Sequence, residues 1–397
     1  MKLSLPALLF LASALPFSAL ADEPPVAPSS GQTSTKPTAA VPLPPLAPLQ
    51  KGANEEITAP GWDYAALAEW RRIPAEAPIK SVAISPDGKT IAGGGDGKVY
   101  LWNDSGDLLL TIITEPQLLP EAPKANPEDD LLGQKRPAPP AMQKWVRLLV
   151  FSPDGKVLAT AGADSTVKLW NMENGQWIRT IAGHQGAVTS LVFTPDSRAL
   201  ATGSLDKNIK LWNTANGQLL GTLSQHVYPV RAVAFSKDLS TLISVGGQGW
   251  GRKNGELKFW DIAGKGELKQ EMTIDGLMPE SAQLLANGRI LASGADFRRP
   301  AVKLWDGETG KFVRNTIPGY SSGIAVSTLT FTSDFRVVAG GSVRTGKHSA
   351  VYLWDVRTGK IMKIIQAAPQ NGLAFSSDGR MLAVAGEDKS IQLWRVP

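Results

Sequence analysis

Residues 191–213, LVFTPDSRALATGSLDKNIKLWN, contain three short apolar runs separated by turn residues. The first run ends at residues 194–197 (TPDS), where Pro presets φ for a type I turn. A run of small residues then reaches a second tight turn at residues 205–208 (LDKN), and the third run closes on Trp212 before a further apolar stretch. This pattern predicts a meander of four antiparallel strands.

The same unit recurs from Ile79 to the end of the chain. Its first turn reappears as SPDG at residues 85–88 and 152–155, and as SSDG at 376–379. The closing Trp returns about every 45 residues, which is the length of a four-stranded propeller blade. Its positions are Trp102, Trp170, Trp212, Trp260, Trp305, Trp354 and Trp394. Seven units predict an all-β, seven-bladed propeller.

The unit resembles the WD40 repeat. Most copies close on Trp-Asn or Trp-Asp, as at residues 170–171 and 260–261, and the resemblance extends from about residue 64 to the end. The last copy stops at its third strand, residues 390–395, while residues 68–73 (AEWRRI) resemble a fourth strand. As in the family, we expect this N-terminal strand to close the ring, because an unpaired edge would invite aggregation.

The first residues predict export. Lys2 precedes an apolar stretch that ends in the small-residue pattern Ala19-Leu20-Ala21, so we expect residues 1–21 to be a signal peptide. The alternative, an uncleaved membrane anchor, is opposed by Pro6 and Pro16 within the apolar run. The style of this segment looks bacterial, which predicts a periplasmic or secreted protein with no transmembrane helix after cleavage.

The remaining chain divides into two regions. Residues 22–60 are dense in Pro, Ala, Ser and Thr, which predicts a disordered linker, with a Pro-rich docking site as the alternative. Residues 61–397 form the predicted propeller, and residues 113–144 form a loop inserted between its first two blades.

Composition excludes several classes of function. The chain has no Cys, so it can form no disulfide, thiolate metal site or Cys nucleophile. Its net charge is +5. In an exported protein this positive charge indicates acidic proteins, anionic glycans or anionic lipids as partners and not nucleic acid.

The family resemblance implies a structural network in one blade: His184, Ser204, Asp206 and Trp212. Asp96, Asp164 and Asp388 keep the same spacing to the Trp of their own units, and His226 precedes the next unit as His184 does. A Ser, His and Asp together also suggest a nucleophilic triad, but we interpret all of them as a buried network.

No catalytic residue, metal site or cofactor is predicted. Residues 341–348 (GSVRTGKH) nearly match a phosphate-binding loop, but His stands where Ser or Thr must bind magnesium, and two antiparallel strands flank it. No paired carboxylates, metal-ligand cluster or activated nucleophile is evident in the predicted loops. We therefore expect a protein that is not an enzyme, with a propeller hydrolase or lyase as the least favoured alternative.

Three consecutive units lengthen the turn between their second and third strands, and these turns are basic and aromatic. Glu256 and Asp296 are the acidic residues that we expect in these turns beside the basic ones. The start of each innermost strand is expected on the same face, and three such positions are basic. The predicted partner-binding residues are Trp250, Arg252, Lys253, Phe297, Arg298, Arg299, Arg344, Lys347, Lys80, Arg147 and Arg231.

Exposed Trp and Arg side chains are typical of binding hot spots. The plain alternative is that basic loops vary in length and serve solubility. We favour a monomeric, non-catalytic scaffold of the cell envelope that binds an acidic segment of another protein through this face. The alternative is a binding module for an anionic glycan or lipid headgroup.

Overall fold

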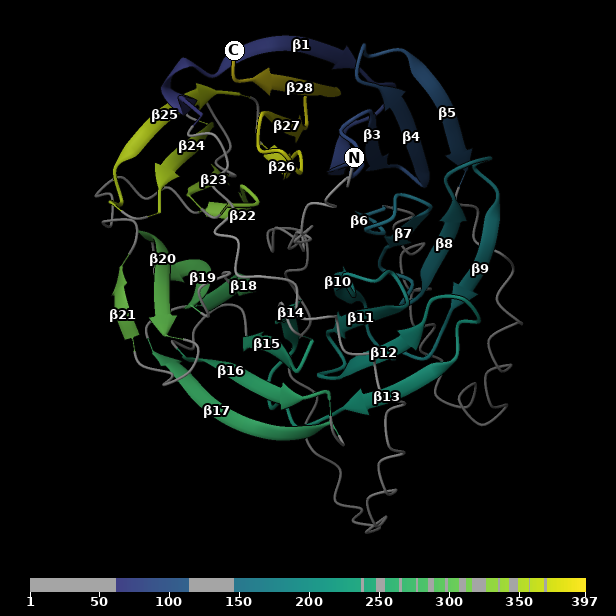
Figure 1. Cartoon of the computed structure of the whole chain (residues 1–397), viewed down its shortest axis with the longest axis vertical. Coiled ribbons are helices and arrows are strands. Elements are labelled where there is room, and N and C mark those ends of the chain that lie inside the picture. Colours follow the sequence, from purple (N-terminus) through teal and green to yellow (C-terminus); the bar gives the residue numbers. More distant parts are fainter. Residues whose placement is uncertain are drawn as a thin grey trace, which may run out of the picture.

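In the computed structural model, four-stranded sheets stand side by side around a centre and form a ring (Figure 1). The structure describes residues 62–113, 146–236, 239–247, 254–263, 266–275, 278–284, 289–296, 299–306, 312–315, 326–334, 336–342, 349–356, 358–367 and 370–397. Each sheet is an antiparallel meander, and we call it a blade.

The strands of the first four blades follow one another along the chain. They are β2 (Ile79–Ile84), β3 (Thr90–Gly95), β4 (Lys98–Asn103) and β5 (Leu108–Ile113); β6 (Leu148–Phe151), β7 (Val157–Ala161), β8 (Val167–Asn171) and β9 (Trp177–Ile181); β10 (Val188–Phe193), β11 (Ala199–Ser204), β12 (Ile209–Asn213) and β13 (Leu219–Leu223); β14 (Val230–Phe235), β15 (Thr241–Gly247), β16 (Asn254–Asp261) and β17 (Glu267–Asp275).

Three further sheets complete the ring. They are β18 (Met278–Leu284), β19 (Arg289–Asp296), β20 (Arg299–Asp306) and β21 (Phe312–Asn315); β22 (Val326–Phe331), β23 (Val337–Ser342), β24 (Ala350–Asp355) and β25 (Ile361–Gln366); β26 (Gln370–Phe375), β27 (Met381–Gly386), β28 (Ser390–Arg395) and β1 (Ala68–Pro74). A short 3-10 helix, η2 (Tyr64–Ala66), precedes β1.

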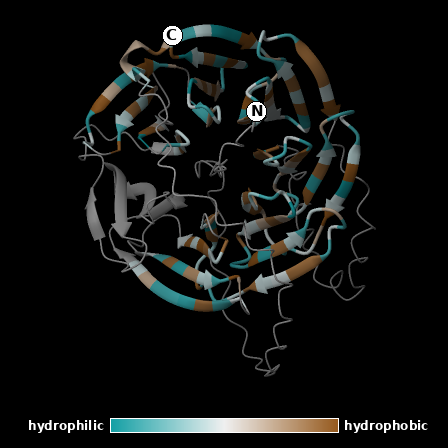
Figure 2. Ribbon diagram, in the orientation of Figure 1, coloured by the Kyte–Doolittle hydropathy of each residue, from teal (hydrophilic) through white to brown (hydrophobic). Residues whose placement is uncertain are grey.

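The number of blades predicted from the sequence needs a correction. Side-chain packing is described for six blades, whereas the sheet β18-β19-β20-β21 is described by its backbone alone (grey in Figure 2). The expectation of a seven-bladed propeller is therefore corrected to six blades, beside one further sheet, β18-β19-β20-β21, that is known only from its strand pairing. The signal peptide, the Pro-rich linker and all of the predicted insert except Ile113, which ends β5, lie outside the described residues.

The last blade takes its outer strand from the start of the propeller. β1 pairs with β28 in antiparallel register, from Ala68 opposite Arg395 to Pro74 opposite Ser390. Ile73 is buried at this seam. Nearby, Tyr64 Oη donates to the Gly379 carbonyl (3.1 Å), and the Arg380 guanidinium lies 4.5 Å from the centre of the Trp62 ring. Residues from both ends of the described chain thus close the ring, as the sequence predicts.

A repeated hydrogen-bond pattern fixes the turn after five of the described innermost strands. In the first blade, Ser85 Oγ donates to Asp87 Oδ1 (2.6 Å) and accepts from the Thr90 N–H (2.9 Å). The same pattern recurs at Ser152, Thr194, Thr332 and Ser376. The fourth turn residue takes a positive φ, +74° at Gly88, which is a conformation that Gly adopts without strain.

The hydrophobic cores lie between blades. One cluster joins Val82 and Trp102 of the first blade to Ala383 and Ile391 of the last, and another joins β6–β9 to β10–β13. Brown, apolar residues accordingly recur along the strands of each blade described with its side chains (Figure 2). Each of these blades therefore depends on its neighbours for the burial of its apolar surface.

The antiparallel order also defines two faces. The starts of the innermost strands and the turns between second and third strands lie on one face, which we call the upper face. The turns between first and second strands, and between third and fourth strands, lie on the opposite, lower face.

Candidate functional site

Most of the predicted binding residues on the upper face lie outside the described part of the chain. These are Trp250, Arg252, Lys253, Phe297, Arg298, Arg344 and Lys347. Arg299 is the first residue of β20, and only its backbone is described. The basic, aromatic surface predicted from the three lengthened turns therefore stays a prediction.

Lys80 is described, and its charge is compensated. Its ammonium group pairs with the Glu387 carboxylate, which also accepts from Asn371 Nδ2 (2.9 Å). Burial would raise the pKa of Glu387, but the hydrogen bonds from Lys80 and Asn371 outweigh it and hold the pKa below its usual value. Because Asn371 also donates to the Ile79 carbonyl (3.1 Å), this cluster joins the first blade to the last on the upper face.

Arg147 and Arg231 mark the starts of two more innermost strands. Arg231 Nε donates to the Gly247 carbonyl at the end of β15 (3.2 Å). Burial lowers the pKa of the Arg147 guanidinium, whose backbone N–H bonds to the Ala161 carbonyl (2.9 Å). Lys80, Arg147 and Arg231 therefore sit on three different blades of one face. Each of the three residues forms a hydrogen bond or ion pair with a neighbouring residue of the propeller.

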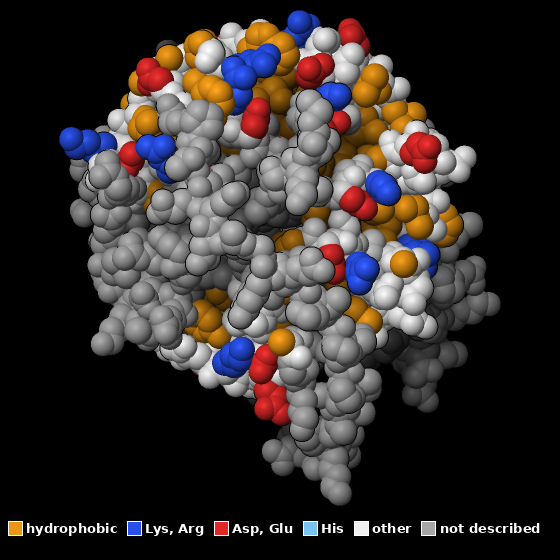
Figure 3. All heavy atoms as spheres, viewed as in Figure 1, with side chains coloured by type: hydrophobic (Ala, Val, Ile, Leu, Met, Phe, Trp, Pro, Cys, Tyr) orange, Lys and Arg blue, Asp and Glu red, His pale blue; other side chains and the backbone are white. Residues whose placement is uncertain are grey.

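Figure 3 shows one face of the molecule. There, the blue Lys and Arg side chains of the described residues lie among red Asp and Glu side chains, and they form no single basic patch. The described residues of that face therefore provide no continuous basic surface.

The network predicted in blade β10–β13 is a buried chain of hydrogen bonds. Trp212 Nε1 donates to Thr202 Oγ1 (2.9 Å), and this hydroxyl lies 2.7 Å from His184 Nε2. His184 Nδ1 lies 2.8 Å from Asp206 Oδ2. Because the indole occupies an acceptor site of the hydroxyl, the hydroxyl hydrogen can point to Nε2, which leaves Nδ1–H of a neutral imidazole to donate to the carboxylate.

Thr202, and not Ser204, supplies the hydroxyl between Trp212 and His184, and Ser204 touches the network only where its hydroxyl accepts from the Asp206 N–H (3.1 Å). Ser204 ends β11, beyond the last pair with β12, and its hydroxyl donates to the Gly186 carbonyl (2.8 Å). Thr202 lies two residues earlier, opposite Lys210, where it reaches the indole of Trp212. Thr202 is fully buried, so no substrate can approach its hydroxyl.

Blade β14–β17 builds the same network with a different acid. His226 Nε2 lies 2.7 Å from Ser244 Oγ, to which Trp260 Nε1 also donates (2.7 Å). His226 Nδ1 lies 2.7 Å from Glu256 Oε2, and this carboxylate also accepts from the Val227 N–H (3.1 Å). Contrary to the prediction from the sequence, Glu256 is therefore not an acid of the basic loop but a buried residue of β16.

The hydrogen bonds of the two networks require neutral imidazoles and ionised carboxylates. Burial lowers the pKa of His184 and of His226, although Asp206 and Glu256 act in the opposite direction. Burial would raise the pKa of each carboxyl group, but hydrogen bonds from the backbone and from the imidazole lower it below its usual value. Neutral imidazoles beside ionised carboxylates match the donor pattern given above.

The other aspartates with the same spacing do not form such networks. Asp164 accepts from the N–H of Thr166 (3.2 Å), and Asp388 accepts from the Ser390 hydroxyl (2.9 Å) and lies 3.5 Å from the Arg72 guanidinium. Asp96 is exposed.

The closing Trp is held differently in different blades. Trp170 Nε1 donates to Thr160 (2.9 Å), like Trp212 to Thr202, whereas Trp394 Nε1 donates to Gln392 Oε1 (3.3 Å). In blade β2–β5, Trp102 stacks on Tyr100 with ring centres 5.5 Å apart and planes at 25°. Trp354 stacks on Tyr352 in the same way.

The described ranges contain neither a metal-ligand cluster nor a membrane-spanning helix. Three His, Asp or Glu side chains of these residues nowhere gather closely enough to hold a metal ion. In the same ranges, no helix has the length and apolar content needed to cross a bilayer.

Comparison with known proteins identifies the repeat. A family described as "WD domain, G-beta repeat" matches residues 71–103, 141–171, 175–213, 217–261 and 360–395. These matches cover all four strands of β6–β9 and β10–β13, and β14, β15 and β16 but not β17. They also cover β2, β3 and β4 of the first blade, β25 to β28, and β1 from Arg71.

Curated relatives share this repeat at modest identity. The nuclear distribution protein nudF of Aspergillus niger is 30% identical over 37% of this chain and 32% of its own length. Protein tipD of Dictyostelium discoideum is 23% identical over 67% of this chain and 42% of its own length. The LST8 homologue of Drosophila melanogaster is 28% identical over 28% of this chain and 31% of its own. The chain thus spans less than half the length of each of these relatives.

Proposed function

Because this chain carries WD40 repeats in a ring of four-stranded blades, we propose that it is a non-catalytic scaffold for protein–protein interactions. One observation carries the proposal: the two described histidines and their acidic partners are committed to buried networks that support the blades. The chemistry of the repeat thus maintains a rigid surface, and a rigid surface suits the binding of another protein.

The proposed contact surface is the upper face, and the proposed partner segment is acidic. Lys80 and Arg231 are the second residues of β2 and β14, and Arg147 directly precedes β6. Trp250, Arg252, Lys253, Phe297, Arg298, Arg299, Arg344 and Lys347 belong to the turns that the sequence assigns to the same face. Opposite charge would speed the encounter and exclude wrong partners, while Trp250 would supply apolar contact area.

A cross-linking pull-down tests this surface. We expect the wild-type protein to capture a specific partner, and a variant with Trp250→Ala, Arg252→Glu, Arg298→Glu and Arg299→Glu to lose it. The control variant, Arg198→Glu with Lys360→Glu, reverses two exposed charges in turns of the lower face and should keep the partner. If both variants capture the same proteins as the wild type, the upper face is not the site.

We also propose that the protein acts outside the cytoplasm, in the cell envelope. The support is the sequence of residues 1–21 together with the complete lack of Cys. Cell fractionation of a version without residues 2–21 tests this proposal. We expect that version to stay in the cytoplasm, and an unchanged distribution would refute export through this segment.

A further inference from the structure

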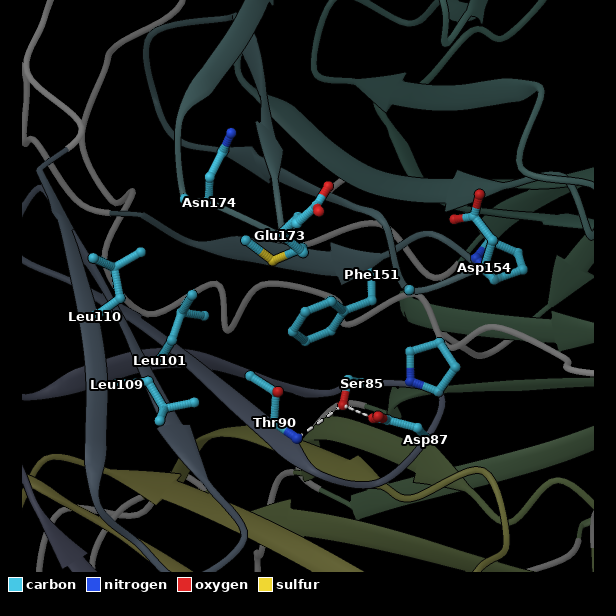
Figure 4. A pocket seen from close by; sticks show the side chains of 15 residues that line it. Ser85, Asp87, Thr90, Leu101, Leu109, Leu110, Phe151, Asp154, Glu173 and Asn174 are labelled. Carbon is cyan, nitrogen blue, oxygen red and sulfur yellow. Dashed lines mark hydrogen bonds between the residues drawn. The ribbon is translucent and has the colours of Figure 1, made fainter.

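A groove lies on the lower face between the first blade and the blade β6–β9. It has a volume of about 550 Å³ and is formed by the turns β2–β3, β6–β7 and β8–β9 together with the outer strand β5. Figure 4 shows Leu109, Leu101 and Leu110 on one side of it, Asp87 and Asp154 on the other, and Phe151 between them. We call this site the β5 groove.

The floor of the β5 groove is apolar. Leu101 and Phe151 are buried beneath it, and Met172 contributes from the turn β8–β9. Gly175 allows the wall to close, because a Cβ at this position would lie only 2.0 Å from Leu110 Cδ2. The groove therefore offers shaped apolar surface between two rigid blades.

The outer strand beside it is unusually apolar. Leu108, Leu109 and Leu110 are consecutive and remain 55%, 57% and 36% exposed. The outer strands β1, β9, β17 and β25 each carry Lys or Arg, which protects an edge, whereas β5 (LLLTII) carries no charge. β13 also lacks a charge, but its large exposed side chain is Leu219 alone. A cluster of exposed leucines of this kind marks a contact surface.

The rim of the groove is acidic. Asp87, Asp154 and Glu173 line it, and none of the other described residues that line it is Lys or Arg. Backbone N–H and Ser hydroxyl groups hold Asp87 and Asp154 in place. Among the described residues, none of the three carboxylates forms a salt bridge, and the Glu173 side chain is exposed. Within the described ranges, the rim therefore presents negative charge that no ion pair compensates.

We propose that the β5 groove binds a basic peptide segment of a partner protein, with aliphatic side chains seated on the apolar floor and Lys or Arg side chains at the acidic rim. An anionic ligand would be repelled by the rim, and an uncharged apolar one would leave the carboxylates unused. This site is separate from the proposed upper-face site and has the opposite charge. The scaffold would thus join an acidic partner to a basic one.

Selection from a phage-displayed library of random peptides tests the proposal and does not require that the partner be identified first. The bait is the folded wild-type protein, and counter-selection uses the Glu173→Lys variant. We expect the enriched peptides to share Lys or Arg next to Leu, Ile or Val. The absence of any enriched peptide, or a shared acidic motif, would overturn the proposal.

Fluorescence anisotropy with an enriched peptide then locates the site. We expect Glu173→Lys and Leu109→Ser each to weaken binding about tenfold, because each removes one component of the groove. The matched controls are Asp104→Lys, an exposed acid in the β4–β5 turn of the same face, and Leu219→Ser on β13. Equal losses with the controls would overturn the assignment to this groove.

The same peptide separates this inference from the proposed function. The upper-face variant with Trp250→Ala and three Arg→Glu changes should bind the peptide with unchanged affinity. If the upper-face variant no longer binds the peptide while Glu173→Lys still does, the β5 groove is not the binding site of the peptide.

Discussion

Blade β10–β13 and blade β2–β5 hold the closing Trp of the repeat, Trp212 and Trp102, in two different ways. In the first, Thr202 stands opposite Lys210 and its hydroxyl receives the Trp212 N–H. In the second, Gly93 stands opposite Tyr100, and the Trp102 ring lies over the glycine and stacks on the tyrosine. The position of the second strand that faces the Trp ring is therefore occupied in one of two ways. It is either a hydroxyl residue with Lys opposite it on the third strand, or a glycine with Tyr opposite it.

The two arrangements stabilise the blade through different forces. The first depends on buried hydrogen bonds, which cost most when one partner is removed. The second depends on close packing, which costs most when volume is added. The same positions should therefore respond to opposite kinds of substitution.

The largest effect is expected in the hydrogen-bonded blade. Thr202→Val keeps the volume but leaves Trp212 Nε1 and His184 Nε2 without their partner, which should lower the free energy of unfolding by about 2–4 kcal/mol. Urea denaturation followed by Trp fluorescence measures this loss. The control is Thr180→Val, where the hydroxyl meets Trp177 on the surface and the change should stay within about 0.5 kcal/mol. Similar losses at both positions would contradict the network's role.

The next effect is expected in the stacked blade. A Cβ at position 93 would lie 2.8 Å from Trp102 Cζ3, so Gly93→Ala should lower the free energy of unfolding by about 1–3 kcal/mol. The near-UV circular dichroism of the Trp should change with it. Tyr100→Phe keeps the stack and serves as the control. A fully stable Gly93→Ala protein would show that the Trp is not held against this glycine.

The third expected effect is a loss of stability in acid, which should come from the two blades with a His network and not from the stacked blade. The unfolded chain protonates His at a pKa of about 6.5, whereas burial holds the pKa of His184 and His226 below that value in the folded state. As the pH falls below 6.5, the unfolded state takes up protons first, so stability decreases. Asp206 and Glu256, whose pKa values are also lowered, extend the loss to lower pH.

Denaturation at a series of pH values measures this slope. His226→Gln removes one titrating imidazole and should flatten the curve between neutral pH and the acid transition. Tyr100→Phe, in a blade without such a network, should leave the slope unchanged. An identical slope in wild type and His226→Gln would refute the link between this network and acid sensitivity.

The smallest effect is expected in the closing blade, which uses a third arrangement. Trp394 is only half-buried, and its bond to Gln392 is long at 3.3 Å, so water can replace the amide. Gln392→Leu should therefore change the free energy of unfolding by less than about 1 kcal/mol. The same denaturation experiment measures it, and a loss as large as that of Thr202→Val would erase the distinction between these blades.

The sequence predicts much of this architecture because turns and the closing Trp are local signals. The register of β11 against β12 depends on strand pairing and not on a local signal, so the spacing of residues alone does not distinguish Thr202 from Ser204. One signal was available: His184 precedes Thr202 by 18 residues, and His226 precedes Ser244 by the same number. Glu256 was missed because the lengthened turn moves the acid from the turn into a strand. Only strand pairing shows that its longer side chain reaches His226.

The sequence does not predict the β5 groove, for a related reason. Asp87, Asp154 and Glu173 come from three turns, and the apolar wall comes from β5 of the preceding blade. No single stretch of sequence contains them together, since only the packing of two blades brings them to one place.

The pairing of β1 with β28 bears on how the protein is made. As a nascent chain leaves the ribosome, residues 68–74 emerge early and must wait for residues 390–395 before they find a partner. Blades such as β10–β13 can form as soon as their own hairpins appear, but the ring stays open until residues 390–395 have been synthesised. Moving residues 68–74 behind residue 397 by circular permutation would let the last blade form from contiguous chain and shorten that wait.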